Sequence, residues 1–407
     1  MRVLQAEKYY WQQGGASRYA LDLSRSLETS GEVVVPFASA HPRNMPSVYS
    51  DYFVSALDFA NLGEAGWWQK MQAAGQIIYS FEARKKIAAL LDKYPVDVAH
   101  LHNIYHQISP SIIPEFKKRQ IPVVMTLHDY KLLTPNYTFF HHDANHEEDA
   151  KGWYLNCISN KCFKDNRLMS ALVTVEMIFH HKIKRYYENG VDIFLAPSNF
   201  CRELFIKNGW DGKKIIHLSL PVDVPAESVS RPGSYVLYVG RLVEEKGVQH
   251  LIEAAAMTPQ ITYKIIGQGL YRDRLQSLIE ERKLTNVMLL GYKQGRELKE
   301  IIADARLVVT PSIWYENYPQ SVLEAKAAGK IIIASSIGGL PELLPPDLLV
   351  APGDAVTLAK KIETWFSASD QKLISRGAEL REEVKKINDP EGHRRAIMEV
   401  YNNVLSR

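Results

Sequence analysis

The sequence predicts an α/β protein made of two doubly wound, Rossmann-like parallel sheets, each in its own domain. The chain has 407 residues, enough for two or three domains with sizeable cores. Short apolar runs alternate with segments of helical periodicity through both halves, which is the pattern of buried parallel strands joined by helices. A polar segment punctuated by Pro221, Pro225, Pro232 and Gly233 interrupts this alternation and marks a linker.

The composition is that of an ordinary soluble globular protein. Apolar residues make up 46% of the chain and charged residues 23%. The formal net charge of +3 gives no reason to expect a nucleic-acid partner. Three cysteines argue against a disulfide framework and fit a reducing compartment. The N-terminus has no signal-peptide pattern, and no apolar run reaches the roughly 18 residues of a membrane span, so we expect a cytoplasmic protein.

Residues 1–220 form the first predicted domain. Strands are expected at 3–5, 32–35, 96–101, 122–127 and 193–196, and helices at 16–30, 67–78, 81–91, 110–118 and 168–188. Gly14 and Gly15 open the first helix, where the lack of a side chain allows a ligand phosphate to approach the backbone amides. A plain tight turn is the alternative interpretation.

Two histidines follow strands of this domain. His102 comes after the strand at 96–101, and His128 comes after the strand at 122–127. The carboxyl ends of parallel strands form the functional edge of such sheets, so both side chains are candidates for ligand contact. A single histidine there would more often cap or pack, but two on one edge favour a site.

Two segments of this domain leave alternatives open. Histidines and cysteines gather in the irregular segment 131–166, at His141, His142, His146, Cys157 and Cys162. Their spacing is a weak zinc pattern, so we favour a solvated loop beside an acceptor pocket. The second half of helix 168–188 is basic, which indicates either a patch facing a lipid surface or a solvated helix end. We favour the solvated end.

Residues 221–388 form the second predicted domain. Strands are expected at 235–239, 263–266, 287–290, 307–310, 331–334 and 348–350, with later helices at 355–366 and 392–405. Arg241 and Lys246 lie in the loop after the first of these strands. Two fixed cations beside amide donors can stabilise a departing diphosphate.

Two glutamates frame the helix that follows the strand at 307–310. Glu316 lies in the loop at the carboxyl end of that strand, and Glu324 lies on the helix, which Pro319 opens in its first turn and Gly329 ends. Exposed glutamates with no function are the alternative. A carboxylate beside the anion-attracting amides of a helix start indicates a ligand carrying both phosphate and hydroxyl groups.

These motifs resemble those of the family-4 retaining glycosyltransferases, which have the GT-B fold. Glu316 and Glu324 match the family's E-x7-E motif, the segment 240–247 matches its G-R-L-x-x-x-K-G loop, and Thr126-Leu-His128 matches its histidine position. The resemblance covers nearly the whole chain. It implies two domains facing across a cleft, with residues 389–407 forming a helix that crosses back to the N-terminal domain, which binds the acceptor.

The resemblance also implies roles for individual residues. Arg241, Lys246 and the Gly14 and Gly15 amides would hold the diphosphate, and Glu324 the ribose. Glu316 would meet the donor sugar near its anomeric carbon, with His128 over the sugar. Further donor contacts would come from Gly267, Tyr292, Asn317, Tyr318 and Pro319, and His102 would lie near the sugar or acceptor.

The implied activity is transfer of a hexosyl unit from a nucleotide-diphosphate sugar to a sugar or lipid-linked sugar, as in bacterial cell-surface polysaccharide assembly. No cofactor beyond that co-substrate and no metal is expected, because the chain has no Asp-x-Asp motif. A lipid-linked acceptor would bring the enzyme to the inner face of the membrane. A nucleotide-sugar 2-epimerase and a non-catalytic nucleotide-sugar-binding module are the rival hypotheses.

Overall fold

The computed structural model describes residues 1–56, 75–225 and 232–406. It divides into two compact units, each with its own parallel sheet. Unit 1 contains Met1–His141, His146–Leu218 and His393–Arg407, and unit 2 contains His142–Asn145 and Ser219–Gly392. The two parallel sheets confirm the predicted fold class. The helix predicted at 67–78 lies mostly outside the described residues, and its described part, 75–78, is helical.

The sheet of unit 1 has six parallel strands in the order β2-β1-β3-β4-β7-β8. They are β1 (Arg2–Ala6), β2 (Val33–Phe37), β3 (Val98–Leu101), β4 (Val123–Thr126), β7 (Ile193–Ala196) and β8 (Ile215–His217). The chain leaves β1 towards β2 on one side and returns to β3 on the other. The switch point of the topology, where open α/β sheets bind ligands, therefore lies between the ends of β1 and β3.

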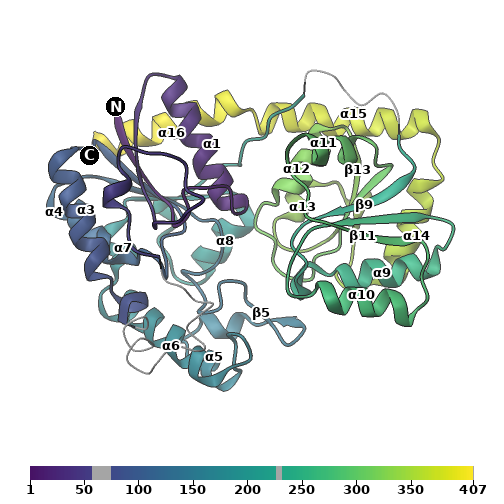
Figure 1. Cartoon of the computed structure of the whole chain (residues 1–407), viewed down its shortest axis with the longest axis horizontal. Helices are drawn as coiled ribbons and strands as arrows, with labels where there is room; N and C mark the ends of the chain where they lie inside the picture. Colours follow the sequence, from purple (N-terminus) through teal and green to yellow (C-terminus); the bar gives the residue numbers. More distant parts are fainter. Residues whose placement is uncertain (57–74, 226–231, 407) are drawn as a thin grey trace. The chain divides into compact units, whose positions relative to one another are not determined.

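Helices cover both faces of this sheet. Figure 1 shows α1 (Gly15–Thr29) and α16 (Pro390–Leu405) on one side, and α3 (Phe81–Lys93), α4 (Ile113–Lys118) and α7 (Tyr186–Gly190) on the other. Tyr19 of α1 and His393 of α16 are hydrogen-bonded at 2.8 Å. Tyr401 of α16 reaches the sheet, where its hydroxyl lies 2.6 Å from Nδ1 of His100. The C-terminal helix therefore completes the core of unit 1.

Several elements of unit 1 differ from the prediction. The single helix expected at 168–188 is α6 (Arg167–Met177), a π-helical turn (Ile178–Ile183) and α7. Arg185, in the left-handed region at φ 51°, separates the last two. The chain before residue 219 also contains the short strand β8, the helices α5 (Asn156–Ser159) and α8 (Asn199–Lys207), and a small hairpin of β5 (Phe140–His141) and β6 (Ala144–Asn145), of which β6 belongs to unit 2. Strand β8 and the hairpin were not predicted, because such short pairings have little sequence periodicity.

The sheet of unit 2 has the order β11-β10-β9-β12-β13-β14 and is also parallel. Its strands are β9 (Tyr235–Val239), β10 (Thr262–Ile266), β11 (Val287–Gly291), β12 (Leu307–Thr310), β13 (Ile331–Ser335) and β14 (Leu349–Val350). Its switch point lies between β9 and β12. The loops carrying Arg241 and Glu316 leave from these two strands.

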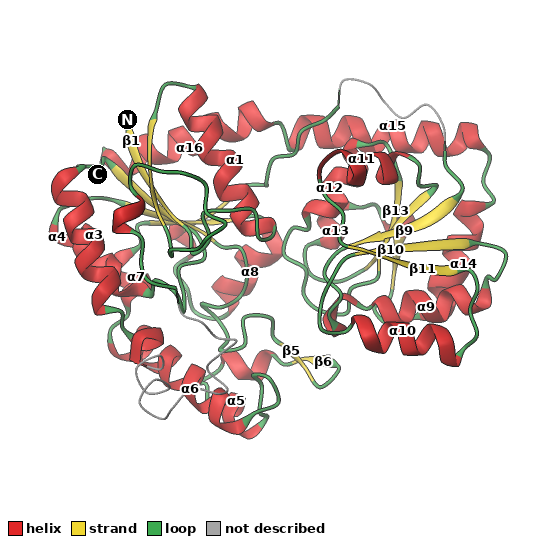
Figure 2. Cartoon of the chain, viewed as in Figure 1, coloured by secondary structure: helices red, strands yellow, loops and turns green. Residues whose placement is uncertain are grey.

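Helices also form two layers around this sheet (Figure 2). One layer contains α9 (Val248–Met257), α10 (Arg272–Glu281) and α14 (Ala355–Phe366); the other contains α11 (Gly295–Ala303), α12 (Gln320–Ala327), α13 (Leu340–Leu343) and α15 (Asp370–Ile387). Helix α15 was not among the predicted elements. Its Gly377 lies so close to Gly329 that an added Cβ would be 1.9 Å from the Gly329 carbonyl oxygen, so glycine is required there.

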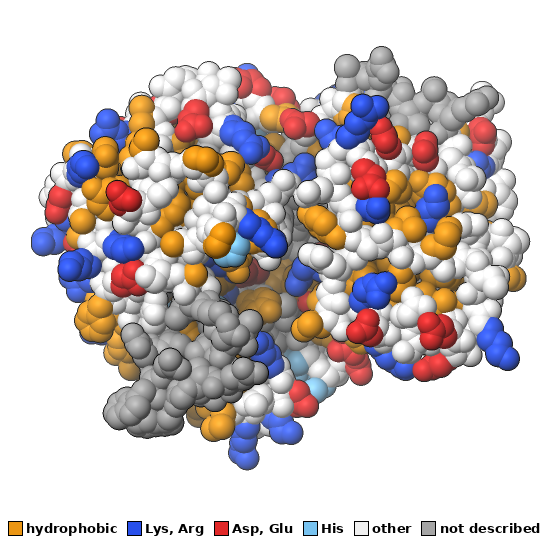
Figure 3. Space-filling view, in the orientation of Figure 1, with side chains coloured by type: hydrophobic (Ala, Val, Ile, Leu, Met, Phe, Trp, Pro, Cys, Tyr) orange, Lys and Arg blue, Asp and Glu red, His pale blue; other side chains and the backbone are white. Residues whose placement is uncertain are grey.

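The face drawn in Figure 3 has acidic and basic side chains interspersed over both units, in agreement with the small net charge. Among the described residues, no helix is long and apolar enough to cross a membrane.

Candidate functional site

The switch point of unit 2 brings together the residues that the sequence singled out in the second domain. After β9 the chain passes Gly240 and Arg241 and forms a 3-10 turn (Glu244–Lys246) before α9. After β12 it forms the loop that holds Glu316. Lys246 Nζ lies 2.6 Å from Oε1 of Glu316, so the two loops are joined by an ion pair.

Glu316 is 3% exposed, and its carboxylate is held from two directions. Besides Lys246, Ser312 donates its hydroxyl to Oε1 at 2.5 Å. Burial alone would raise the pKa of Glu316, but the charge and hydrogen bond of Lys246 and the hydrogen bond of Ser312 outweigh it and lower that pKa. Glu316 is therefore a fixed anion at neutral pH.

Two glycines allow these loops to approach. Gly247 has φ +68°, and an added Cβ there would lie 1.9 Å from the Pro311 carbonyl oxygen. Gly338 has φ +60°, and its Cβ would lie 2.2 Å from the carbonyl oxygen of Glu316. The next amide, of Gly339, donates to that same oxygen at 2.7 Å. The backbone of Glu316 is therefore braced by the glycine turn after β13.

The cations beside this pair differ in exposure. The Arg241 side chain is 56% exposed and lies 3.7 Å from Glu245, a weak surface contact. The Lys246 side chain is 16% exposed and lies over the Trp314 ring at 4.9 Å. Arg241 can therefore turn towards an anion at little cost, whereas Lys246 is already positioned by its neighbours.

The helix after Glu316 begins one residue later than predicted. Pro319 is the N-cap of α12 with extended φ and ψ, so the prediction that it occupies the first turn is wrong. Its ring fits the cap because no backbone donor is needed there. Glu324 lies on α12 and is half-buried.

The remaining predicted donor residues of unit 2 occupy the same loops or the next ones. Asn317 and Tyr318 are buried, and the Tyr318 hydroxyl accepts a hydrogen bond from the Asn388 side chain at 2.9 Å. Gly267, at φ +153°, would place a Cβ 1.8 Å from the Gly240 carbonyl oxygen, so the turn after β10 packs on the loop after β9. Tyr292 is exposed after β11.

In unit 1, His128 and His102 form a hydrogen-bonded relay with Gln5. Gln5 Oε1 lies 2.6 Å from Nε2 of His102, and Nδ1 of His102 lies 3.0 Å from Nε2 of His128. A carbonyl oxygen only accepts, so Nε2 of His102 carries the proton and its Nδ1 accepts from Nε2–H of His128. The relay leaves Nδ1 of His128 as the acceptor nitrogen of that ring.

Both rings are neutral at physiological pH. Burial, followed by the charge of Lys8, lowers the pKa of His128 to about 3. Burial, His100 and His128 lower the pKa of His102 well below its usual value. The two histidines were predicted to lie together at one edge of the sheet, and the structure places them in contact. Gln5 was not predicted as their partner, although a polar side chain on a central strand was an available signal.

Gly14 and Gly15 lie at the start of α1. Gly14 is the N-cap, and its amide and that of Gln13 are each 3.1 Å from the Ser17 hydroxyl. Neither glycine has positive φ, and an added Cβ at either would meet no atom within 4 Å. The packing of the described chain therefore does not require glycine at these two positions.

Much of the segment 141–162 is exposed, as expected of a solvated loop, but Asp149, Tyr154, Cys157 and Cys162 are buried within it. His141 lies 2.7 Å from the buried Asp149, and its ring stacks on His146 at 3.9 Å. Cys157 and Cys162 form a disulfide, buried against Val173, which the sequence analysis did not expect. Within the described residues, no three His, Cys, Asp or Glu side chains are arranged to hold a metal ion.

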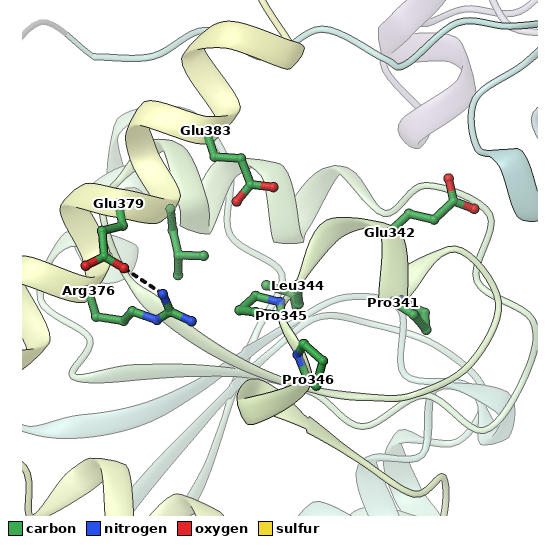
Figure 4. Close-up of a pocket in the computed structure, with 9 residues that line it drawn as sticks. Pro341, Glu342, Leu344, Pro345, Pro346, Arg376, Glu379 and Glu383 are labelled. Carbon is green, nitrogen blue, oxygen red and sulfur yellow. Dashed lines mark hydrogen bonds and ion pairs between the residues drawn. The ribbon is translucent and has the colours of Figure 1, made fainter.

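A cavity of about 300 Å³ lies elsewhere in unit 2, between α15 and the chain around α13 (Figure 4). It is lined by Pro341, Glu342, Leu344, Pro345, Pro346, Arg376, Glu379, Leu380 and Glu383. Arg376 is paired with Glu379 at 2.6 Å, and none of the predicted site residues lines the cavity. The candidate residues therefore lie at the switch point of each unit and not around this cavity.

Comparison with known proteins agrees with these motifs. The model of glycosyltransferase family 4 matches residues 13–224, and that of the glycosyl transferases of group 1 matches residues 226–386. The putative colanic acid biosynthesis glycosyltransferase WcaL of Escherichia coli K12 is 30% identical over 231 residues, which cover 52% of this chain and 56% of that protein.

Solved structures of other proteins also resemble the whole chain. Sucrose-phosphate synthase of Thermosynechococcus elongatus superposes with a TM-score of 0.72 at 19% identity, covering 100% of this chain and 99% of that one. Anabaena HepE in complex with UDP-glucose superposes with a TM-score of 0.69 at 16% identity, covering 99% and 100%. At such identities the likeness concerns the fold.

Proposed function

The chain belongs to the family-4 glycosyltransferases of group 1 type and has the GT-B fold, and from this premise we propose that it transfers a hexosyl unit from a nucleotide-diphosphate sugar to a saccharide or lipid-linked saccharide, with retention of configuration. The observation that carries the proposal is the buried Glu316–Lys246 pair at the switch point of unit 2. The pair places a permanent anion beside a cation. A ligand whose reacting carbon becomes positive while its leaving group becomes negative needs both charges.

The chemistry follows from these charges. As the bond between the anomeric carbon and the diphosphate breaks, positive charge develops on the sugar and negative charge on the phosphate oxygens. Glu316 stabilises the first, and Lys246 with Arg241 stabilises the second, by groups already oriented before the reaction. Glu324 on α12 accepts hydrogen bonds from the ribose hydroxyls, and His128 contacts the transferred sugar.

The donor and acceptor classes come from the relatives' chemistry. The HepE structure was solved with UDP-glucose, which supports a nucleotide-diphosphate sugar as donor. WcaL is named for colanic acid biosynthesis, which supports a saccharide acceptor in polysaccharide assembly. Arg241 and Lys246 supply the electrostatic role that a divalent metal plays in other nucleotide-sugar enzymes, so we expect turnover to be unchanged in excess EDTA.

Two glutamate variants test the assignment. Glu324→Ala should weaken UDP binding in calorimetry by roughly ten- to hundredfold, because a hydrogen bond to a charged group is worth about 1.5–3 kcal/mol. Glu316→Gln should leave UDP affinity nearly intact and lower the turnover number with the intact donor, because what it loses acts mainly in the transition state. Glu297→Ala, at an exposed pair with Lys293, is the control. Full turnover by Glu316→Gln, or normal UDP binding by Glu324→Ala, would show that the roles are wrong.

A further inference from the structure

Glu7 is a buried carboxyl group at the switch point of unit 1. It directly follows β1, is 5% exposed, and its Oε2 accepts a hydrogen bond from the Asn103 amide at 3.0 Å. Asn103 directly follows His102, after the neighbouring strand β3. The two residues therefore meet at the point between diverging loops where ligands bind in open α/β sheets.

The second oxygen of Glu7 has no such partner. Oε1 is buried, and no described residue makes a hydrogen bond of normal geometry to it. A buried carboxylate oxygen without a partner is costly, and native proteins rarely keep one unless a ligand or function requires it.

The charges of Lys8 and Asp129 and the backbone amide of Tyr9 also act on the Glu7 carboxyl group. The Asp129 carboxylate accepts a hydrogen bond from Tyr105, whose hydroxyl also lies 2.7 Å from the Asn103 side-chain oxygen. Lys8 lies over the Tyr105 ring at 5.6 Å. The loops after β1, β3 and β4 thus bring the carboxyl groups of Glu7 and Asp129 and the side-chain oxygen of Asn103 to this point, with the Lys8 charge beside them.

Carboxylate and amide oxygens of this kind accept hydrogen bonds from hydroxyl groups. These oxygens differ from the Lys246–Glu316 pair at the switch point of unit 2, where the cation suits a diphosphate. We propose that Glu7 is a sugar-binding residue whose Oε1 accepts a hydrogen bond from a hydroxyl group of a neutral saccharide. The inference rests on the proposed function, since it assigns this part of unit 1 to one of the two sugars of the reaction.

Two sources could supply that hydroxyl group: the hexose of the donor or the acceptor saccharide. Binding of that hydroxyl group can be followed through the pKa of the Glu7 carboxyl group. Burial and, to a smaller extent, the charge of Asp129 raise the pKa of Glu7 to about 7, partly offset by Lys8 and the amides of Asn103 and Tyr9. A hydroxyl donating to Oε1 stabilises the charged form, so saccharide binding should lower this pKa by about one unit.

The experiment is carbon-13 NMR of the full chain labelled at glutamate side-chain carboxyls. The Glu7 resonance is identified by its loss in Glu7→Gln, a variant of the same shape. Its pH titration is recorded with UDP alone, with UDP-, GDP- and ADP-hexoses, and with methyl glucosides, galactosides and mannosides. The resonance of Glu115, a buried glutamate paired with Arg84 and Arg119, serves as the internal control.

The expected result is a lowered Glu7 pKa with at least one saccharide and no change at Glu115. A response to nucleotide hexoses but not to UDP assigns the donor sugar, and a response to methyl glycosides assigns the acceptor. If every saccharide leaves the Glu7 resonance unmoved while a nucleotide binds in calorimetry, Oε1 holds only water and the inference is wrong. If no nucleotide binds at all, the proposed function fails instead.

Discussion

The two units both have a six-stranded, doubly wound parallel sheet, with different strand orders and different chemistry at the switch points. In unit 2 the loops at the switch point carry an ion pair, Lys246 with Glu316, beside the exposed Arg241. In unit 1 the equivalent loops carry two neutral histidines and Glu7, whose pKa is raised to about 7. Burial acts on all these groups, but Lys246 lies 2.6 Å from Glu316 and outweighs its burial, whereas the charge of Lys8 offsets the burial of Glu7 only in part. The difference shows that the partner of a buried group, more than its burial, decides its charge.

The largest expected effect comes from breaking the ion pair of unit 2. Lys246→Met leaves the Glu316 carboxylate buried without its cation, which should cost about 3–5 kcal/mol. Hydrogen exchange of peptides from β9 and β12 should report this loss, while peptides from β1 and β3 serve as the reference.

Two variants control this experiment. Adding Glu316→Gln to Lys246→Met should recover much of the loss, because no charge is then left unpaired. Lys293→Met, at the more exposed pair with Glu297, should change stability by less than about 1 kcal/mol. Equal effects of Lys246→Met and Lys293→Met would contradict the role given to the buried pair.

The second-largest expected effect is a pH dependence of the folding stability that arises from Glu7. Its folded-state pKa of about 7 lies above its ordinary value of 4.5, so its contribution to stability is fully present below pH 4.5 and is lost as pH rises through 7. Between pH 5 and 8, wild type should lose on the order of 3 kcal/mol relative to Glu7→Gln.

Urea unfolding followed across this pH range, with exchange of unit 1 peptides as the probe, measures the difference. The buried histidines act in the opposite direction, since their lowered pKa values cost stability as pH falls below about 6.5. Comparison with Glu7→Gln cancels that contribution. Parallel pH profiles for the two proteins would mean that Glu7 titrates normally.

A smaller effect is expected from the disulfide of unit 1. Cys157 and Cys162 are five residues apart, so their bridge closes a short loop and should contribute about 2 kcal/mol. The double variant Cys157→Ser with Cys162→Ser should lower the stability of unit 1 by this amount and leave unit 2 unchanged. An equal loss in both units would indicate that the effect is not local.

The smallest effect should come from the histidine relay. Gln5→Leu removes the acceptor of His102 Nε2–H, so His102 and His128 lose their preferred tautomers. Nitrogen-15 chemical shifts of the imidazole rings should change from single-tautomer to averaged values. Turnover should fall by no more than about tenfold, which corresponds to about 1.4 kcal/mol.

Thr126→Val is the matched control for the relay. Thr126 lies 2.8 Å from Nε2 of His100, which stacks on His102 but has no place in the relay. If the nitrogen-15 chemical shifts of His128 changed in Thr126→Val but not in Gln5→Leu, the assignment of protons in the relay would be wrong.

Much of the fold and the outline of the site could be predicted from the sequence, because both depend on local patterns. Apolar runs too short for helices predicted most strands, since a parallel strand is buried on both faces. Residues in the loops after such runs, among them His128, Arg241 and Glu316, were placed at the carboxyl ends of strands for the same reason. Elements with weak periodicity, such as the hairpin of β5 and β6, were missed.

Only the tertiary structure decided how these residues are partnered. Lys246 and Glu316 are 70 residues apart, and Gln5 and His102 are 97 apart, so no local pattern could pair them. The same holds for Glu7 and Asn103, which meet because β1 and β3 are neighbours in the sheet. Charge, tautomer and pKa depend on such contacts through burial and short-range electrostatics. The residue types were therefore readable from the sequence, whereas their protonation states follow from the fold.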